Sequence, residues 1–511
     1  MKPASLLLKT RSGSILLVTM VTLLLATAAT MGVLTITANS LHLCGRQRAG
    51  AVAFNLAESG AEIAGLWLKA QPYPPSGTQS FNPFGGTVSL DDGTYTVTIY
   101  PDANNPTSYL KTYRLVSVGT ALGMTRTIEL VVKQASFGRY AYFTDKETSS
   151  ISGGAIWWKA GESVDGPAHS NNSSGSNFNI NYNNSNSPIF LDMLTGAGNT
   201  INYNPSRPRN ETTFKRIFLD GSKGFKLGVD PIMLPPSSNA QRDAAWGATS
   251  GFPTTNGVYL RPNLDGGLYI RGDAAIQLSV NGSGNQVVTI TQGSSVTAVT
   301  FDRFTRSASA TGPLGYGSSP TASSLGTGVI YCTGNITSLR GTVADNYVSG
   351  EEIEVRSGWT IANDVNAGKT IKITNNLVYN TRPDKTQDRT ASANLLAGTL
   401  GLVSKDIIIG SSAPANLEID GVCLAGGHNT TTGSFYVQNY DTKTPTGTLR
   451  VLGGIIQKNR GPVGTFNSST GVTSTGYAKD YSYDPRMAND PPPYFPTTGQ
   501  YDRLSWQVLA N

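Results

Sequence analysis

Residues 14–36 read Ser-Ile-Leu-Leu-Val-Thr-Met-Val-Thr-Leu-Leu-Leu-Ala-Thr-Ala-Ala-Thr-Met-Gly-Val-Leu-Thr-Ile, and this stretch decides how the rest of the chain is organised. No aspartate, glutamate, lysine or arginine occurs between Ser12 and Gly45. As a helix, these 23 residues are about 35 Å long, which is enough to cross a hydrocarbon layer of about 30 Å. The stretch therefore predicts a transmembrane helix.

The sequence remains compatible with a helix to about residue 70. Residues 51–68 place four apolar side chains near one helical face: Val52, Leu56, Ile63 and Trp67. Glu58 and Glu62 fall on the opposite side, where a solvated like-charge pair is the simplest interpretation. We therefore predict one continuous helix over residues 14–70, half in lipid and half packed on an exported domain.

A cleaved secretory signal is the alternative interpretation of the N-terminus. Basic residues precede the apolar run, and Ala26-Thr27-Ala28 has the small side chains of a cleavage site. The uncharged run, however, continues to Gly45, well beyond such a site. This continuation favours an anchor over a signal.

The charge distribution argues against a nucleic-acid-binding protein. The net charge is +6, but the first 50 residues hold five basic side chains and no acidic one. The other 461 residues carry 34 basic and 33 acidic side chains, which is close to balance. Positive charge that flanks an apolar run at one end indicates a membrane rather than a nucleic-acid groove.

Two motifs resemble the PilX-type N-terminal region of type IV pilus assembly proteins. They are Arg11-Ser12-Gly13 before the apolar run and Asn55-Leu-Ala-Glu-Ser-Gly-Ala-Glu62 behind it. The resemblance implies cleavage by a prepilin peptidase between Gly13 and Ser14, and an assembly helix that bears Glu58 and Glu62. It also implies that the partners are other pilins or pilus assembly proteins, and the inner membrane.

One position departs from the pattern of the major pilins. They carry a glutamate five residues after the cut, whereas this chain has Val18. The departure fits a minor, initiating or accessory subunit, or a protein that keeps its leader and stays in the membrane.

Behind the helix, the composition predicts a mainly β protein of about three domains, because only 14% of the residues are charged and 57 are glycine. Prolines end the helix after residue 71. Alternating stretches at 92–100, 111–119 and 124–133 predict a small antiparallel sheet. Residues 1–13 are then a basic leader, 14–70 the long helix and 71–135 a small pilin-like β head.

The remaining sequence divides into three further regions. Residues 136–256 form an Asn/Ser/Gly-rich β and loop region, and residues 257–466 contain short strands separated by Gly, Asn or Asp turns at intervals near twenty residues. That spacing predicts a right-handed parallel β-helix, or solenoid, with a β-sandwich as the rival fold. Residues 467–511 are rich in proline and aromatic residues, and predict a strap that caps the solenoid or binds a partner.

No cofactor or metal site is expected from the sequence. His42, His169 and His428 lack metal-ligand spacing, and His169 is interpreted as structural. Calcium binding by the Asp/Asn-rich turns stays open, although no EF-hand is visible. Cys332 and Cys423 lie in apolar strands and are expected to be buried unpaired thiols, like Cys44 beside the membrane segment; a single Cys332–Cys423 bridge stays open.

The acidic residues of the predicted solenoid do not form a catalytic cluster in the sequence. They are scattered, at Glu351, Glu352, Glu354, Asp364, Asp406 and Asp420. Hydrolases of carbohydrate need carboxylates on one face. Arg271-Gly272-Asp273 matches an integrin-binding tripeptide, but a strand and turn explain it better.

The sequence therefore predicts a non-enzymatic bacterial inner-membrane protein whose bulk is exported. It would assemble with, prime or decorate a type IV pilus or a related secretion filament, and present its β domain for adhesion. The alternatives are a carbohydrate-active surface enzyme and an exported scaffold unrelated to pili.

Overall fold

The computed structural model describes residues 12–71, 75, 78–102, 110–173, 175–183, 185–261, 266–305, 307–315, 326–350, 352–388 and 390–510. They form two compact units. Unit 1 comprises the residues up to 133 together with 501–511, and unit 2 comprises residues 134–500. The chain is mainly β with one long N-terminal helix, which confirms that part of the prediction. Most of the basic leader, residues 1–11, lies outside the described residues.

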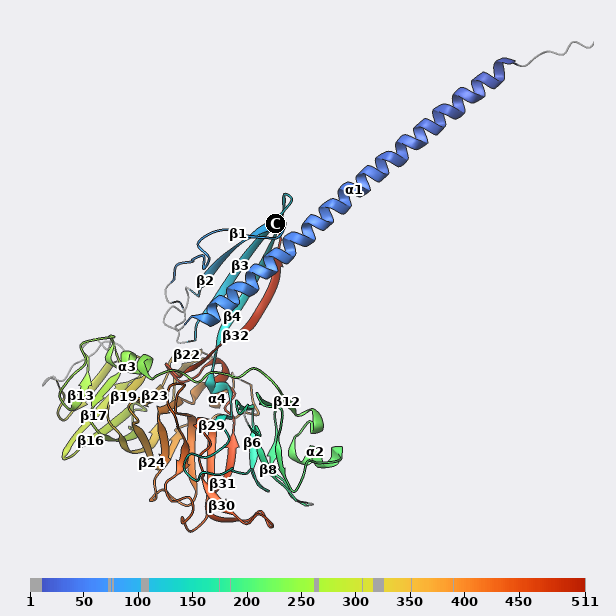
Figure 1. Ribbon diagram of the computed structural model, residues 1–511. Helices are drawn as coiled ribbons and strands as arrows, with labels where there is room; N and C mark the ends of the chain where they lie inside the picture. Colours follow the sequence, from blue (N-terminus) through green and yellow to red (C-terminus); the bar gives the residue numbers. More distant parts are fainter. Residues whose placement is uncertain are drawn as a thin grey trace, which may run out of the picture. The chain divides into compact units, whose positions relative to one another are not determined.

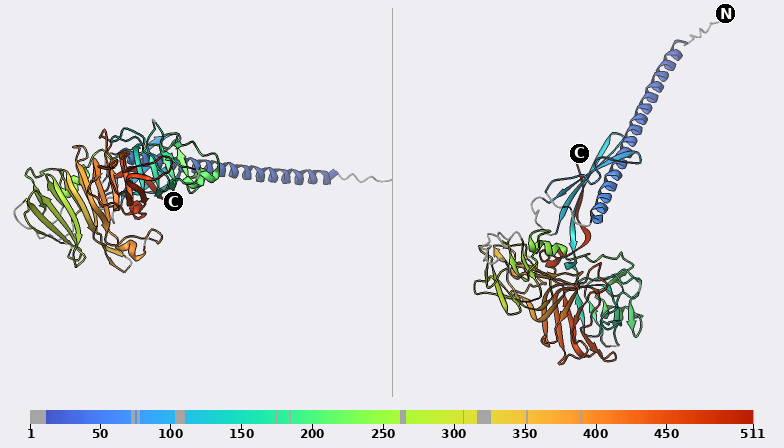
Figure 2. Two further views of the ribbon diagram at one scale, coloured as in Figure 1. Left: turned by 90° about the horizontal axis from the view of Figure 1, so that it is seen from below. Right: turned by 60° about the vertical axis from the view of Figure 1, so that its left-hand side comes forward.

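Helix α1 (Ser12–Ala70) is one uninterrupted helix of 59 residues (Figures 1 and 2). This confirms the prediction of a single helix across the apolar and amphipathic segments. From residue 15 to residue 48 its side chains are exposed, and from Ala49 onward one face is buried.

The buried half of α1 packs on a five-stranded sheet with the order β1-β2-β3-β4-β32 (Figure 1). The strands are β1 (Val88–Leu90), β2 (Gly93–Pro101), β3 (Thr112–Ala121), β4 (Met124–Ser136) and β32 (Thr497–Leu509). The pairs β1–β2, β2–β3 and β3–β4 are antiparallel, as the alternating stretches predicted. The last strand comes from the C-terminus, so unit 2 is an insertion between two neighbouring strands of this sheet.

Small residues bring α1 unusually close to strand β3. A Cβ atom on Gly119 would lie 2.1 Å from the carbonyl oxygen of Ala53 and 2.5 Å from the backbone nitrogen of Ala57. On the helix, a Cβ atom on Gly60 would lie 2.4 Å from the Ser117 hydroxyl. The buried face consists mainly of alanine, glycine and leucine: Ala53, Leu56, Ala57, Gly60, Ala61, Ala64 and Leu68. The close helix–sheet contact therefore depends on residues with small side chains or none.

Ile63 differs from the prediction, because 38% of it is exposed although the pattern placed it with Leu56. The other three predicted residues do belong to the contact, since Leu56 is buried in it and Val52 and Trp67 pack against it. The true contact face is marked by alanine and glycine, which give little hydrophobic signal.

We predict that Gly119→Ala destabilises unit 1 by about 1–3 kcal/mol, because its new methyl group meets helix backbone that cannot move aside. Gly65→Ala is the matched control: nothing lies within 4 Å of its Cβ position, and alanine favours a helix over glycine by about 1 kcal/mol. Hydrogen exchange in β2 and β3 of the detergent-solubilised chain measures both. Equal protection in the two variants would contradict the close approach.

Most strands of unit 2 belong to one 23-stranded sheet. Its parallel pairs form three rows, which we name A, B and C. Row A follows the order β14 (Leu268–Arg271), β19 (Val329–Cys332), β23 (Gly358–Asn363), β25 (Thr399–Ser404), β27 (Leu417–Ala425), β29 (Gly447–Asn459), β5 (Tyr142–Lys146), β7 (Ala168–Ser170), β10 (Leu194–Gly196) and β12 (Phe225–Leu227).

Rows B and C use neighbouring strands and the other halves of the long ones. Row B follows β15 (Ala274–Val280), β20 (Ile336–Val343), β24 (Thr370–Tyr379), β26 (Asp406–Ile409) and β28 (Phe435–Val437). Row C follows β24, β27, β29, β31 (Thr473–Ser482), β6 (Ser163–Asp165) and β9 (Ile189–Phe190). The interior between the rows holds a large apolar core.

Shorter elements decorate these rows. The antiparallel pairs are β13 (Gly257–Leu260) on β14; β15, β16 (Gln286–Gln292), β17 (Ser295–Asp302) and β18 (Ser307–Thr311) in succession; β21 (Tyr347–Ser349) on β22 (Glu352–Val355); and β30 (Gly464–Phe466) on β31. Strands β8 (Asn179–Asn181) and β11 (Asn202–Asn204) pair in parallel. The helices are η1 (Phe137–Arg139), α2 (Glu211–Ile217), η2 (Gly221–Lys223), α3 (Asn239–Trp246), α4 (Ser392–Leu396) and α5 (Arg486–Asn489).

The order of row A does not follow the chain. The row starts near residue 268, proceeds to β29, and then continues with β5, which lies more than 300 residues earlier in the sequence. Strands of the predicted regions 136–256 and 257–466 therefore belong to one sheet. We call the β29–β5 and β31–β6 pairings the seam.

The predicted strap over 467–511 divides into three different elements. Residues 473–482 are strand β31, and residues 497–509 are the sheet strand β32. Between them, Pro492, Pro493 and Phe495 lie against glycines of β23, β25 and the turn before β19; a Cβ atom on Gly401 would lie 2.4 Å from the Phe495 ring. Only this short piece is a strap, because the alternation that follows Pro496 suits an extended strand.

Asp420 in β27 provides a pH test of unit 2. Its carboxylate accepts one hydrogen bond, from the Tyr379 backbone N–H at 3.1 Å, and Oδ1 has no partner. Burial raises its pKa from 3.8 to about 6. The negative charges of Glu418 and Asp484 act in the same direction, whereas the positive charge of Arg382 opposes the rise. The folded state thus favours the protonated acid, and the stability this group supplies is present below about pH 4 and lost as the pH rises through about 6.

We predict that Asp420→Asn stabilises unit 2 by about 1–3 kcal/mol at about pH 8, and has little effect at about pH 4. Thermal unfolding of the detergent-solubilised chain at the two pH values measures this. Asp364→Asn, at a half-buried carboxylate that caps a turn, is the matched control. A gain that is equal at both pH values would contradict the raised pKa.

Candidate functional site

The exposed half of α1 is the first candidate site. It is long and apolar enough to cross a membrane, and none of its most apolar window is buried within the chain. Each of its six threonines donates its hydroxyl to a carbonyl three or four residues earlier; they are Thr19, Thr22, Thr27, Thr30, Thr35 and Thr37. The helix thereby satisfies its own polar groups, which lowers the cost of an apolar environment. Such a helix fits a membrane anchor or a signal.

The predicted cleavage residues lie at the start of α1. Gly13 and Ser14 have helical backbone, and the side chain of Ser14 is outside the described residues. Val18 is exposed on the same helix, four residues beyond Ser14.

The two glutamates predicted for the assembly helix have different surroundings in the structure. Glu58 is exposed, whereas Glu62 forms an exposed ion pair with Arg503 of β32. Nearby, the ring of Trp506 in β32 meets Phe54 of α1 edge-on, with centroids 6.2 Å apart. Helix α1 is therefore held to the C-terminal strand by one ion pair and one aromatic contact.

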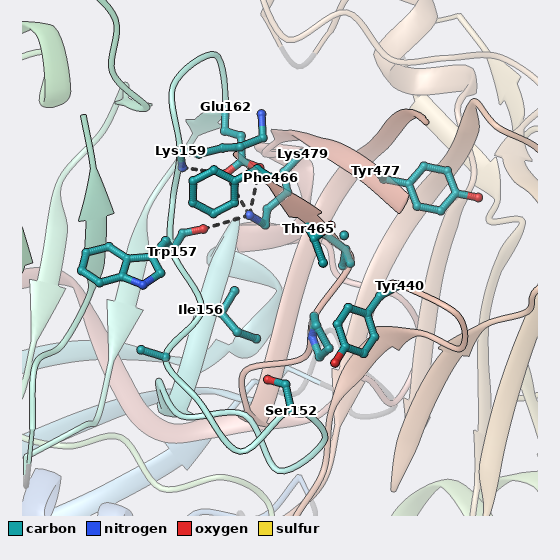
Figure 3. A pocket seen from close by; sticks show the side chains of 14 residues that line it. Ser152, Ile156, Trp157, Lys159, Glu162, Tyr440, Thr465, Phe466, Tyr477 and Lys479 are labelled. Carbon is teal, nitrogen blue, oxygen red and sulfur yellow. Dashed lines mark hydrogen bonds and ion pairs between the residues drawn. The ribbon is translucent and has the colours of Figure 1, made fainter. Parts of the chain in front are cut away.

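Unit 2 contains a second candidate, a cavity of about 220 Å³ beside the seam (Figure 3). The Lys479 ammonium lies 2.8 and 2.9 Å from the two carboxylate oxygens of Glu162, and also donates to the carbonyl of Trp157. The Glu162 carboxylate further accepts the Lys159 backbone N–H at 3.0 Å. Burial lowers the pKa of Lys479 to about 8, although Glu162 acts in the opposite direction.

A second buried ion pair lies at the same seam. Arg460 donates to Glu147 at 2.7 Å, and each side chain is only 2% exposed. Glu147 also accepts hydrogen bonds from the hydroxyls of Thr144 and Tyr142. Both cations lie over the Trp158 ring, at 4.6 Å from its centroid for Arg460 and 5.0 Å for Lys479. In both pairs an acidic side chain is neutralised by a basic side chain from a distant part of the sequence. The pairs therefore fit a structural role in joining the two segments.

The sequence did not indicate the seam residues. Glu162 and Lys479 are 317 positions apart, and Glu147 and Arg460 are 313 apart. No spacing rule connects such distant positions.

The histidines and cysteines are placed as follows. His169 is buried and its ring nitrogens contact the Thr195 hydroxyl at 2.8 Å and Asn171 Oδ1 at 2.9 Å, while burial lowers its pKa. His42 and His428 are exposed. Cys332 and Cys423 are buried and free, which confirms unpaired thiols over the bridge, and Cys44 is free and exposed.

The six acidic residues that the sequence analysis named in the predicted solenoid do not form one cluster, and Asp364 among them is half-buried in the turn after β23. Glu351 lies outside the described residues, Glu352 and Glu354 are exposed, and Asp406 and Asp420 are buried in different strands. Within the part of the chain that the structure describes, no group of three or more His, Cys, Asp or Glu side chains could hold a metal ion.

Comparison with known proteins gives distant similarity to solved structures. No family model and no curated protein matches this chain. The crystal structure of the competence-associated pilin ComZ from Thermus thermophilus matches 90% of this chain and 97% of that chain, with 14% identity and a TM-score of 0.28. A TM-score of this size does not establish a shared fold.

We predict that Lys479→Met destabilises unit 2 by about 3–5 kcal/mol, because it leaves the Glu162 carboxylate buried and unpaired. The double variant Glu162→Gln with Lys479→Met should recover much of this loss. Arg450→Met is the matched control, since its pair with Asp480 also involves strand β31 but is exposed, and should cost less than about 1 kcal/mol. Thermal unfolding compares the three; equal losses at Lys479 and Arg450 would contradict a structural role for the seam pair.

Proposed function

We propose that this chain is a membrane-anchored, non-enzymatic component of a type IV pilus or related secretion filament, similar to PilX-type minor pilins. Helix α1 anchors the chain in the bacterial inner membrane, and the residues after it are exported. Unit 2 is presented outside for adhesion. Other pilins or pilus assembly proteins are its partners.

One observation carries this proposal. The same uninterrupted helix has an exposed apolar half and a half that packs on an antiparallel sheet through alanine and glycine. A subunit that waits in a bilayer and later joins a filament needs both surfaces on one rigid helix. The uncharged run, including Val18, suits an accessory subunit.

For unit 2 we propose a right-handed parallel β-solenoid. The three rows of parallel strands support it, since each residue range contributes to the rows in turn and the apolar residues lie between them. Three of the buried acids, Glu147, Glu162 and Asp484, are each matched by a buried cation, and this matching supports a non-enzymatic role.

We predict that Leu25→Arg releases a large share of the chain from the membrane fraction, because an arginine near the middle of the apolar run costs about 2.5–3.5 kcal/mol on insertion. Leu41→Arg is the matched control: its side chain is equally exposed, but it lies near Arg46, where an arginine can reach the interface. Cell fractionation followed by N-terminal sequencing gives the readout.

N-terminal sequencing also separates the alternatives. A mature chain that starts at Ser14 and copurifies with filaments supports the proposal, and a start at Met1 limits it to a static anchor. A soluble chain that starts near Ala29 and is absent from filament preparations overturns it.

A further inference from the structure

A second cavity, of about 440 Å³, lies in unit 2 where three successive turns follow row A. The turns are Arg271–Asp273 after β14, Thr333–Asn335 after β19, and Asp364–Lys369 after β23. The parallel registers of β14, β19 and β23 stack these turns in order. We call this space the turn cavity. Its volume falls within the roughly 300–1,000 Å³ of small-molecule sites, whereas the seam cavity is smaller and already holds an ion pair.

Side-chain and backbone contacts fix the wall of the turn cavity. Asp273 Oδ1 accepts the Asn335 backbone N–H at 2.7 Å, and Asn335 Oδ1 in turn accepts the N–H of Thr370 at 3.0 Å. The Gly272 N–H donates to the Thr333 hydroxyl at 3.0 Å, with Gly272 at φ +90°. A Cβ atom on Gly334 would lie 2.3 Å from the Asp273 carboxylate. The wall is therefore formed before any ligand arrives.

Three half-buried cations line the turn cavity: Arg242, Arg271 and Lys369. Arg242 is engaged, since it pairs with Asp243 at 2.8 Å and lies over the Phe252 ring at 4.6 Å. Burial raises the pKa of Tyr269, and the nearby Arg271 acts in the opposite direction. Among the described residues, neither Arg271 nor Lys369 has a carboxylate within 4.0 Å. Two cations are thus available to an anionic group that enters.

Hydrogen-bond acceptors line the same space. Asp273 and Asp364 each use Oδ1 for turn N–H groups, and their Oδ2 atoms accept no hydrogen bond in the described structure. Thr333 and Asn256 add neutral polar groups. The aromatic rings behind them are stacked on one another, Phe252 on Tyr269 at 6.0 Å and Tyr269 on Tyr331 at 5.9 Å, so their faces are not open to a ligand.

This combination selects the ligand chemistry. Cations bind a carboxylate strongly, while free carboxylate oxygens accept hydrogen bonds from hydroxyl groups. A nucleic acid is disfavoured, because its successive phosphates would meet Asp273 and Asp364, and such binding needs many phosphate contacts. We propose that the turn cavity binds a uronic-acid sugar, a polyol with one carboxylate, as a unit of an acidic polysaccharide. Arg271 and Lys369 would hold the carboxylate, and Asp273 and Asp364 the hydroxyls.

The proposal changes how Arg271-Gly272-Asp273 is interpreted. An integrin-type tripeptide needs a protruding loop, whereas here Arg271 and Gly272 are half-buried and the Asp273 carboxylate is bonded to the next turn. In the wall of the turn cavity, Arg271 instead contributes a positive charge, Gly272 a tight turn, and Asp273 a hydrogen-bond acceptor. The inference specifies what unit 2 would adhere to, but it does not depend on the membrane anchor.

The test is calorimetric titration of the full detergent-solubilised chain with trigalacturonate, an acidic trisaccharide, and with maltotriose as its neutral counterpart. We expect trigalacturonate to bind at least tenfold more tightly than maltotriose, and less tightly at high salt. Arg271→Gln and Lys369→Gln should each weaken its binding about tenfold or more. Arg340→Gln, at an exposed arginine outside the cavity, should leave it unchanged.

Four outcomes would overturn the inference: no binding of trigalacturonate, equal binding of maltotriose, unaltered binding by both cavity variants, or binding of single-stranded DNA in place of the sugar. Arg271→Lys, which keeps the charge, should retain more affinity than Arg271→Gln and guards against a folding artefact. A chain that stays in the membrane yet binds no acidic sugar overturns this inference alone, whereas a soluble chain that binds it overturns only the anchor.

Discussion

The insertion of unit 2 between two neighbouring strands constrains everything that follows in the fold. Because β4 and β32 lie side by side in one sheet, residues 134 and 500 must be close together. Contacts at the base of the insertion show this directly: Gln134 donates to Thr497 at 3.0 Å, and the Phe137 N–H donates to the carbonyl of Pro496 at 3.1 Å. A stack of strands that ran from one end to the other would separate its termini. Unit 2 instead begins with β5, in the middle of row A, and its next strands extend the row as far as β12. The chain then crosses to the opposite end of the row, where β14 lies.

The crossing segment shows how that arrangement is held. Between β12 and β13 the chain passes along the stack, and its contacts advance from one layer to another. The Ile232 N–H donates to Asn171, the carbonyl of Pro235 accepts from His428, and the Ser238 hydroxyl donates to the carbonyl of Asn363. Helix α3 then reaches Gly267, just before β14. The segment that the sequence presents as an irregular region is thus a return path required by the position of the insertion.

Local patterns predicted the local elements well and the long-range pairings poorly. The apolar run indicated α1, and alternation located β2, β3 and β4 within three residues, because these elements depend on neighbouring residues. The pairing of β29 with β5 joins residues more than 300 positions apart, and no periodicity records it. The small-residue face of α1 was missed since alanine and glycine carry little hydrophobic signal. Strand β32 was not predicted, because the prolines before it indicated a strap. The turn cavity was not predicted either, because its three turns are brought together only by the stacking of the strands.

The buried ion pairs at the seam follow from the same constraint. Parallel strands with similar apolar residues can pair in more than one register, and a split stack has two inner edges that could pair with another copy of the chain. Glu147 with Arg460 and Glu162 with Lys479 satisfy their charges only when β5 meets β29 and β6 meets β31 in the observed register. Any slip would bury an unpaired charge, which costs several kcal/mol. Apolar residues at these positions could supply similar stability, but they would not distinguish the correct strand register from the neighbouring registers. Few residues in this chain are charged, yet a buried ion pair lies at each of the two strand pairings of the seam. Their placement is therefore best explained by a role in fixing the register.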